Sequence, residues 1–140
     1  AVVNAASFDA RPLGRNAIAT VFGENLWREG GITRVWVNNN VAATVLGATP
    51  NQVNFVLPAS VNPGSARLVI ERDGLRGPEA MFWVTEAAPA VFVAQNHSDG
   101  RVNSVETPVR AGETLVVYLT GIGTNRALPW QVLWNGETID

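Results

Sequence analysis

The stretch that decides the fold is residues 33–72, TRVWVNNNVAATVLGATPNQVNFVLPASVNPGSARLVIER. It holds runs rich in Val, Ile, Leu and Phe, over residues 33–37, 41–46, 52–57 and 65–72, separated by breaks that carry Asn, Gly or Pro. Apolar runs of about four to eight residues between turn signals are typical of antiparallel strands. The triple Asn at 38–40 adds a hairpin signal, because Asn tolerates the positive φ of tight turns.

Side chains in these runs alternate, which predicts the face that each strand turns to the core. Val53, Phe55 and Leu57 are expected inside, and so are Leu68 and Ile70. In the first run, Arg34 and Trp36 are expected on the face opposite to the two core-facing valines. The stretch therefore predicts a sheet with one buried face.

Further strands are predicted on both sides of this stretch. Residues 1–7 suit an edge strand, residues 8–14 a bend, residues 17–22 a central strand and residues 79–85 a last strand. An Asp-Gly pair at 73–74 predicts another hairpin turn, and no helical periodicity of useful length is present. Strands at this spacing favour an all-β fold, an immunoglobulin-like β-sandwich over residues 1–86.

The chain then starts to repeat itself, after a linker or crossing segment at residues 87–101. Residues 3–5 resemble residues 102–104, Pro12 matches Pro108, the strand at 17–22 resembles 114–119, and residues 35–39 resemble 132–136, at offsets of 96 to 99. Such spacing suggests tandem modules. Residues 102–140 are therefore predicted to form an incomplete second immunoglobulin-like repeat that lacks counterparts of residues 41–85.

Half a sandwich cannot bury its apolar face alone, and its last strand leaves an open edge. Three solutions remain open: the sequence continues in a longer protein, the partial repeat folds back onto the first module, or another copy supplies the missing strand. For the last solution the candidate donor strand is the amino-terminal segment, Ala1, Val2, Val3, Asn4, Ala5, Ala6 and Ser7.

Composition excludes several classes of function. The net charge of −2 gives no electrostatic reason to expect nucleic acid, and no apolar run reaches the roughly 20 residues of a membrane helix. Cysteine is absent, so neither disulfides nor thiolate metal sites are expected. The ten basic residues are all Arg. Because the chain starts at Ala1 without Met, a leader or upstream region is expected to have been removed or omitted.

Several motifs taken together resemble one known family. They are VNAASF near the start, FGENL after the strand at 17–22, TRVWVN, TPNQVNFVLP and PGSARLVI, with APAVF at 88–92 and LTGIG at 119–123. The chain resembles an uncharacterised bacterial C-terminal domain family of exported proteins made of two IPT/TIG-like (immunoglobulin-like) repeats. The resemblance covers essentially the whole sequence. It implies an extracellular, non-catalytic β-sandwich module and transfers no catalytic residue.

Polar motifs in the linker do not predict chemistry. His97, Ser98 and Asp99 are the residue types of a hydrolase triad, but neighbours in one loop cannot form the relay. Asn96, Asp99 and Asn103 could offer oxygens to Ca²⁺, although the full loop pattern is missing. The Asn-His-Ser sequence at 96–98 matches a glycosylation sequon. We expect a solvated turn here, with no metal and no cofactor.

Carboxylates are the other chemical candidates. Glu24, Glu29, Glu71 and Asp73 could supply the two carboxyl groups of a glycosidase, but strand ends on a surface carry such charges routinely. Gly121-Ile122-Gly123 follows a strand without a helix after it, so no phosphate loop is predicted. No catalytic residue is assigned, and the chain is not expected to be an enzyme.

Tryptophan is the most informative residue type. The five Trp residues are Trp27, Trp36, Trp83, Trp130 and Trp134. They could be buried against the second half of the same chain, anchor a subunit contact or stack on sugar rings. In particular, Trp27 is expected to plug one end of the sandwich rather than make an exposed contact.

The sequence thus predicts a non-catalytic extracellular structural module, a building block of a cell-surface or filamentous assembly formed with other copies of itself or the rest of a larger surface protein. The alternative is a carbohydrate-binding or adhesion module that meets polysaccharide through its Trp faces. An enzyme is the third class.

Overall fold

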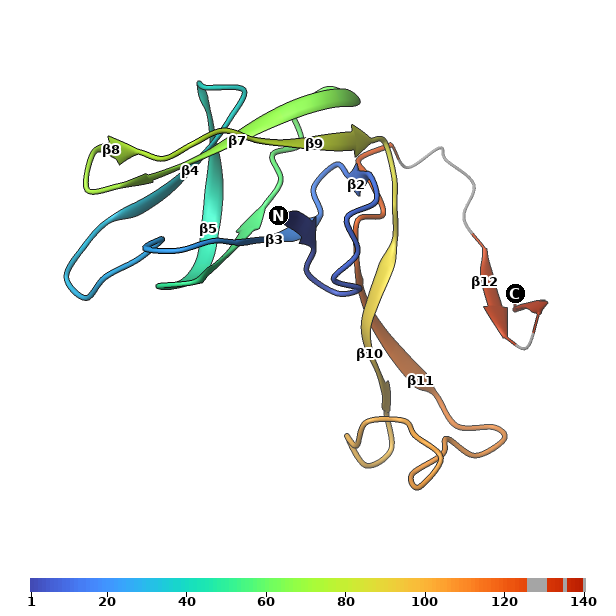
Figure 1. The fold of residues 1–140 in the computed structure, drawn as a ribbon. Coiled ribbons are helices and arrows are strands. Elements are labelled where there is room, and N and C mark those ends of the chain that lie inside the picture. The colour runs from blue at the N-terminus through green and yellow to red at the C-terminus, as the bar shows by residue number, and fades with distance from the viewer. Residues whose placement is uncertain (126–130, 135, 140) are drawn as a thin grey trace.

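The computed structural model describes residues 1–125, 131–134 and 136–139, and these residues contain strands and no helix. The strands of the first part of the chain are β1 Val2–Asn4, β2 Leu13–Gly14, β3 Ile18–Phe22, β4 Thr33–Val37, β5 Val41–Thr49, β6 Gln52–Val56, β7 Gly64–Arg72, β8 Leu75–Arg76 and β9 Ala80–Thr85. Those of the second part are β10 Ala90–Asn96, β11 Leu115–Thr120, β12 Val132–Trp134 and β13 Glu137–Ile139. The predicted all-β class is confirmed (Figure 1).

Residues 1–86, here called the first unit, form a sandwich-like pair of sheet layers. One layer has the order β1-β3-β6-β5 and the other the order β5-β4-β7-β9-β2, with β8 beside β7. Strand β5 belongs to both, because residues 41–43 pair with β4 and residues 44–49 pair with β6. A register irregularity between Val45 and Gly47 lies in the second of these pairings.

The core lies between the two layers and follows the predicted alternation. Phe55 and Leu57 are fully buried, and Gln52 and Asn54 on the other face of the same strand stay partly exposed. The core cluster consists of Val2, Leu13, Ala19, Val21, Val35, Val37, Val53, Phe55, Leu57, Val61, Ala66, Leu68, Ile70, Phe82 and Val84. Both layers contribute to it, and they cover each other's inner faces except where they separate along one side of the unit.

The predicted hairpin turns have the backbone that their residues favour. Asn38 and Asn39 adopt φ of 48° and 70° between β4 and β5, and Asp73 and Gly74 adopt φ of 53° and 82° between β7 and β8. Asn, Asp and Gly tolerate positive φ, which the two-residue turn at 73–74 requires and the three-residue turn at 38–40 also contains.

The segment predicted as a bend, residues 8–14, also contains a strand. Its residues Leu13 and Gly14 form β2, which pairs in parallel with Val84 and Thr85 of β9. The pairing brings Leu13 into the core and joins the amino-terminal segment to both layers, through β1 on one and β2 on the other. A two-residue strand has no periodicity, so the sequence pattern could not reveal it.

Residues 90–139, here called the second unit, repeat the pairing of β1 with β3. In the first unit Val2, Val3 and Asn4 lie opposite Val21, Thr20 and Ala19. In the second unit Ala94, Gln95 and Asn96 of β10 lie opposite Val117, Val116 and Leu115 of β11. Each of these residues in β10 lies 92 positions after its counterpart in β1, and each of those in β11 lies 96 positions after its counterpart in β3.

The turns between these strands repeat as well. Phe8 N–H donates to the carbonyl of Asn4, and Gly100 N–H donates to the carbonyl of Asn96, each at 2.9 Å. Phe8 and Gly100 both have positive φ. A second turn, closed by Ala17 N–H on Gly14, recurs where Glu113 N–H donates to Arg110.

The counterpart of β1 is therefore β10 and not residues 102–104. Residues 87–101, which the sequence suggested as a linker or crossing, contain a strand of the second unit, and the unit starts earlier than predicted. The match of residues 3–5 to residues 102–104 was wrong because the loop between the paired strands is longer in the second unit and because the residues of β1 and β10 differ.

Strands β12 and β13 form a hairpin in which Val132, Leu133 and Trp134 lie opposite Ile139, Thr138 and Glu137. By the resemblance of residues 35–39 to 132–136, β12 corresponds to β4. Strand β13 then follows β12 as β5 follows β4, although the sequence predicted no counterpart of residues 41–85. Among the described residues, no strand of the second unit corresponds to β6, β7 or β9.

The two units meet in a junction of closely packed backbone. Ala88 N–H donates to the carbonyl of Gly121 at 2.8 Å, and Ile18 N–H donates to the buried Thr120 Oγ1 at 2.7 Å. A Cβ on Gly121 would overlap the carbonyl oxygen of Ala88, and one on Gly14 would lie 2.7 Å from Ala88 N. Only glycine allows so close an approach.

We predict that Gly121→Ala lowers the melting temperature of the chain more than Gly112→Ala. Both glycines have positive φ, but a Cβ on Gly112 meets nothing within 4 Å. The matched variant therefore reports only the backbone strain of about 1 kcal/mol, and Gly121→Ala adds an overlap that costs about 1–3 kcal/mol more. Thermal unfolding followed by circular dichroism measures both; equal losses would contradict the packed junction.

Candidate functional site

A cluster of charged and aromatic side chains covers the outer face of β4 and β7. Trp36 Nε1 donates to Glu71 Oε2 at 3.1 Å, and Arg34 Nη1 lies 3.1 Å from Glu71 Oε1. Arg76 also pairs with Glu71, at 3.3 Å, and its guanidinium carbon lies 5.3 Å from the centre of the Trp36 ring. Trp36 is on the outer face, as alternation predicted, but its indole is already engaged by these neighbours.

Glu71 is the centre of this cluster, with a side chain only 13% exposed. The hydrogen bond from Arg34 lowers the pKa of Glu71 most strongly, burial opposes it, and the bonds from Arg76 and Trp36 lower it further. A general acid needs a raised pKa. The lowered pKa of Glu71 instead suits a charged group that stabilises the fold through its ion pairs.

The other carboxylates considered as catalytic candidates do not converge. Asp73 accepts a hydrogen bond from Ile32 N–H at 2.8 Å and pairs with Arg28 Nε at 2.7 Å, and these contacts lower its pKa. Glu24 and Glu29 are exposed in the segment between β3 and β4. Glu71 and Asp73 thus stabilise the sheet and its turn, and no carboxyl pair of the kind used by glycosidases is formed by these residues.

Trp83 is the one open to solvent among Trp27, Trp36 and Trp83, whose side chains the structure describes. It lies on β9, where Phe82 and Val84 point inward, and 63% of its surface is exposed. Met81, two residues earlier on the same face, is 62% exposed. Together they form an apolar spot on the outer face of the sheet, which leaves the interface and sugar-stacking interpretations of Trp83 open.

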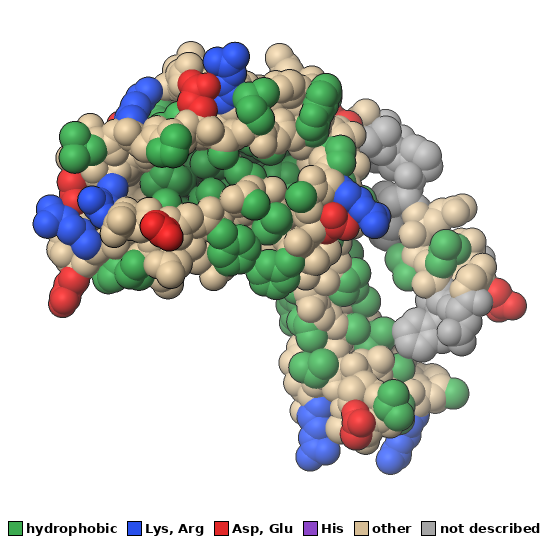
Figure 2. Space-filling view, viewed as in Figure 1, with side chains coloured by type: hydrophobic (Ala, Val, Ile, Leu, Met, Phe, Trp, Pro, Cys, Tyr) green, Lys and Arg blue, Asp and Glu red, His purple; other side chains and the backbone are tan. Residues whose placement is uncertain are grey.

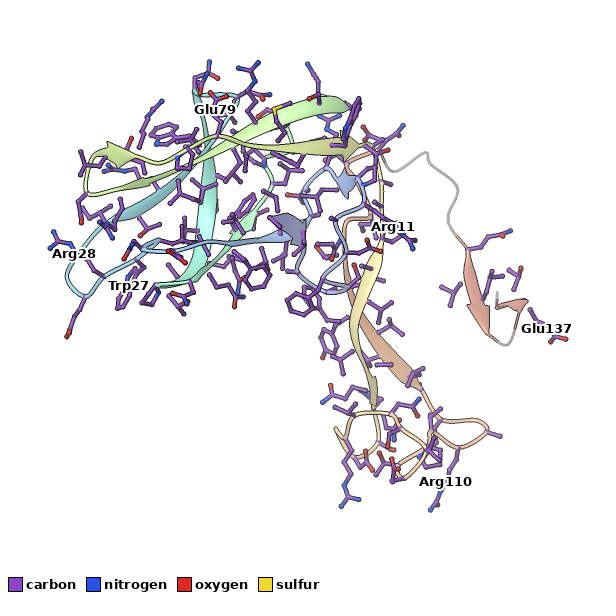
Figure 3. The ribbon with its side chains drawn as sticks, viewed as in Figure 1. Arg11, Trp27, Arg28, Glu79, Arg110 and Glu137 are labelled. Atoms are coloured by element: carbon purple, nitrogen blue, oxygen red, sulfur yellow. The ribbon has the colours of Figure 1, made fainter. Side chains whose placement is uncertain are left out.

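The remaining tryptophans contribute less. Trp27 is half-buried in the loop between β3 and β4, at the end of the first unit away from β10 and β11 (Figure 3). Trp134 lies on β12. Trp130 lies outside the described residues.

The His-Ser-Asp sequence forms an exposed turn, as predicted. His97 N–H donates to the carbonyl of Thr114, and Asp99 Oδ1 accepts from Arg101 N–H at 3.0 Å. Asn103 Oδ1 accepts from Val109 N–H at 2.7 Å, and Asn96 is buried with its Nδ2 donating to Thr107. The oxygens of Asp99 and Asn103 that were candidates for Ca²⁺ therefore stabilise loop backbone.

A groove opens along one side of the first unit, where the two layers separate (Figure 2). Its volume is about 450 Å³; core residues such as Val21, Leu68 and Ile70 form part of its wall, with Arg72 and Glu79 among the charged residues along it. The amino terminus at Ala1 also borders it. Charges of both signs at its margin give no preference for a charged ligand.

The ribbon of β10 and β11 carries apolar side chains that lie open to solvent (Figure 2). Its exposed large apolar residues are Val91, Phe92, Val117, Tyr118 and Leu119. Val21, the counterpart of Val117, is only 5% exposed in the first unit, whereas Val117 is 39% exposed. The sequence predicted an open edge at the last strand of the partial repeat, but no residue of this ribbon was among the site candidates. The uncharged run LVVYLT of β11 was the signal that could have identified it.

The proposed donor segment, Ala1 to Ser7, is engaged within its own unit. Val2, Val3 and Asn4 are buried in β1 and pair with β3. Donation to another chain would require breaking the pairing of β1 with β3. The donor role therefore stays a prediction, and it would carry the free-energy cost of that lost pairing.

Comparison with known proteins gives no family for this chain. No protein-family model matches it, and no curated protein matches it either. Within the described residues, no group of three or more His, Cys, Asp or Glu side chains is arranged to hold a metal ion. No helix capable of spanning a membrane occurs in that part of the chain.

We predict that the chain loses stability as the pH falls below about 4.5. Hydrogen bonds from Arg15 and Thr124 lower the pKa of Glu86, and the pKa values of Glu71 and Asp73 are lowered as described above. A carboxyl whose pKa is lower in the folded state stabilises it above the unfolded pKa, and that contribution disappears as the pH falls through the folded pKa. Melting temperatures between pH 7 and pH 3 measure the loss.

Glu86→Gln should flatten this pH dependence, because Glu86 joins Arg15 of the first unit to Thr124 beyond β11. Glu29→Gln, at an exposed loop position, is the matched control. An unchanged slope in Glu86→Gln would contradict the role of this carboxylate.

Proposed function

We propose that the chain is a non-catalytic structural module, a building block of an extracellular or cell-surface assembly. The observation that carries the proposal is the repeated pairing of β1–β3 and β10–β11 across a junction of packed backbone. Two units joined by close backbone contacts hold their ends at a fixed separation, which is what a spacer or a filament subunit requires.

The strand order supports an immunoglobulin-like type of sandwich. In the constant-type arrangement one sheet has the order ABED and the other CFG. With β1, β3, β6 and β5 as the first sheet, and β4, β7 and β9 as the second, the first unit has this order. The short parallel pairing of β2 with β9 adds the amino-terminal segment to the second sheet. This topology agrees with the IPT/TIG-like resemblance of the sequence motifs.

The polar clusters support a structural role. Glu71, Asp73 and Glu86 all have lowered pKa values because arginine and backbone donors surround them. Each of these clusters joins elements distant in sequence: β4 to β7, the loop before β4 to the turn after β7, and the first unit to the second. The ion pairs of Glu71 and Asp73 connect strands and turns of the first unit, and the hydrogen bond from Thr124 to Glu86 connects the two units.

Assembly is supported by the open ribbon of the second unit. A two-stranded ribbon is marginally stable in water by itself, and this one has apolar side chains exposed along both strands. Addition of strands from another polypeptide would remove that surface from water. The bacterial extracellular location follows from the family resemblance and remains part of the proposal.

A specific observation favours one alternative, a polysaccharide-binding module. Trp83 and Met81 form an exposed apolar spot on a flat sheet face, and an indole ring can stack on a sugar. Ser65 and Arg67 of β7 lie opposite Trp83 and Met81, and Arg67 already pairs with Glu79 at 3.4 Å. Because a single exposed indole offers a small stacking surface, we place this function second.

Calorimetric titration of the chain with a panel of polysaccharides separates the two functions. The structural role predicts no saturable heat, and Trp83→Ala should behave like the parent chain. A saturable heat that disappears in Trp83→Ala, but persists in Trp27→Ala as a matched tryptophan control, would replace the structural proposal with the binding module.

A further inference from the structure

We propose that β11 is the contact strand of a two-fold dimer, in which its open edge pairs antiparallel with β11 of a second copy of this chain. The inference rests on the proposed structural role and names the partner and the residues that join it. It starts from a difference between the two units: β3 has neighbours on both sides, β1 and β6, but its counterpart β11 pairs only with β10 among the described residues.

The repeat identifies which edge of the ribbon lacks a neighbour. In the first unit β1 ends the sheet, and the strand beyond β3 is the antiparallel β6. The corresponding place in the second unit is therefore beside β11 and not beside β10. The strand that fills it should be antiparallel and should set apolar side chains opposite Leu115 and Val117, as Phe55 and Val53 lie opposite Ala19 and Val21.

Backbone groups at this edge are available for pairing. His97 N–H donates to the carbonyl of Thr114, so Thr114 faces β10. Inward and outward groups alternate along an antiparallel strand. Leu115, Val117 and Leu119 therefore present their N–H and C=O groups to the open edge.

The sequence of β11 is complementary to itself. With Val117 on the two-fold axis, Leu115 lies opposite Leu119 of the second copy, and every outward N–H and C=O of these three residues finds a partner. Val116 then lies opposite Tyr118, an aromatic and β-branched pair that stabilises antiparallel strands. The strand LVVYLT contains no charge and no proline, so two copies do not repel each other and the strand itself carries none of the residues that protect an edge from pairing.

Sedimentation analysis of the full chain, with charge variants at the axis, tests this interface. The parent chain should sediment at twice its monomer mass of 15.0 kDa in the micromolar range. Val117→Lys and Val117→Glu should each sediment at the monomer mass, because two like charges would face each other across the axis. An equimolar mixture of these two variants should recover the dimer.

Val91→Lys is the matched control, since it places the same charge on an exposed valine of the same ribbon but on β10. It should remain dimeric, and circular dichroism should show that all variants keep their strand content. A monomeric parent chain, a dimeric Val117→Lys, a monomeric Val91→Lys or a mixture that stays monomeric would each overturn the proposal. If the parent chain sediments as a monomer and also binds no polysaccharide, the dimer interface is wrong but the proposed structural role is not contradicted.

Discussion

The structure depends on one constraint: the apolar inner face of a sheet must be covered by a second layer, and a central strand of that sheet also needs a neighbour on each side. Strand β3 meets this requirement through β1, β6 and the opposite layer, and its inner residues Ala19 and Val21 are buried. Its counterpart β11 has β10 alone among the described residues, and its side chains remain exposed. The same local pairing thus produces a closed unit in one half of the chain and an acceptor for further strands in the other.

The junction explains why the second unit has a defined position despite its open edge. Gly121 and Gly123 approach the backbone of residues 86–88 so closely that side chains could not fit. Thr120 and Thr124 add hydrogen bonds to Ile18 and Glu86. These contacts use main-chain groups and short side chains, which have little conformational entropy to lose. The ribbon is therefore attached to the first unit where β10 begins and β11 ends, and its apolar strands extend away from that unit (Figure 1).

Much of the first unit could be predicted from the sequence, because alternation and turn chemistry are local signals. The run at residues 52–57 and the Asn turn at 38–40 show directly which face is buried and where the chain reverses. The parallel pair β2–β9, the correct counterpart of β1 and the contacts of Trp36 with Glu71 and Arg76 could not be predicted, since each depends on residues distant in sequence. The open ribbon of β10 and β11 could be predicted in part. Its apolar composition is evident in the sequence, but that β11 lacks a neighbour corresponding to β6 follows only from the strand pairing.

Amide hydrogen exchange along the chain at low and high protein concentration tests the central claim that β11 is an unfilled equivalent of β3. We expect the amides of β3 to be protected equally at both concentrations, because their partners lie in the same chain. The outward amides of Leu115, Val117 and Leu119 should exchange fast at low concentration and gain protection at high concentration. Protection of these three amides that is high at every concentration would show that the edge is already filled within one chain, and would contradict the account.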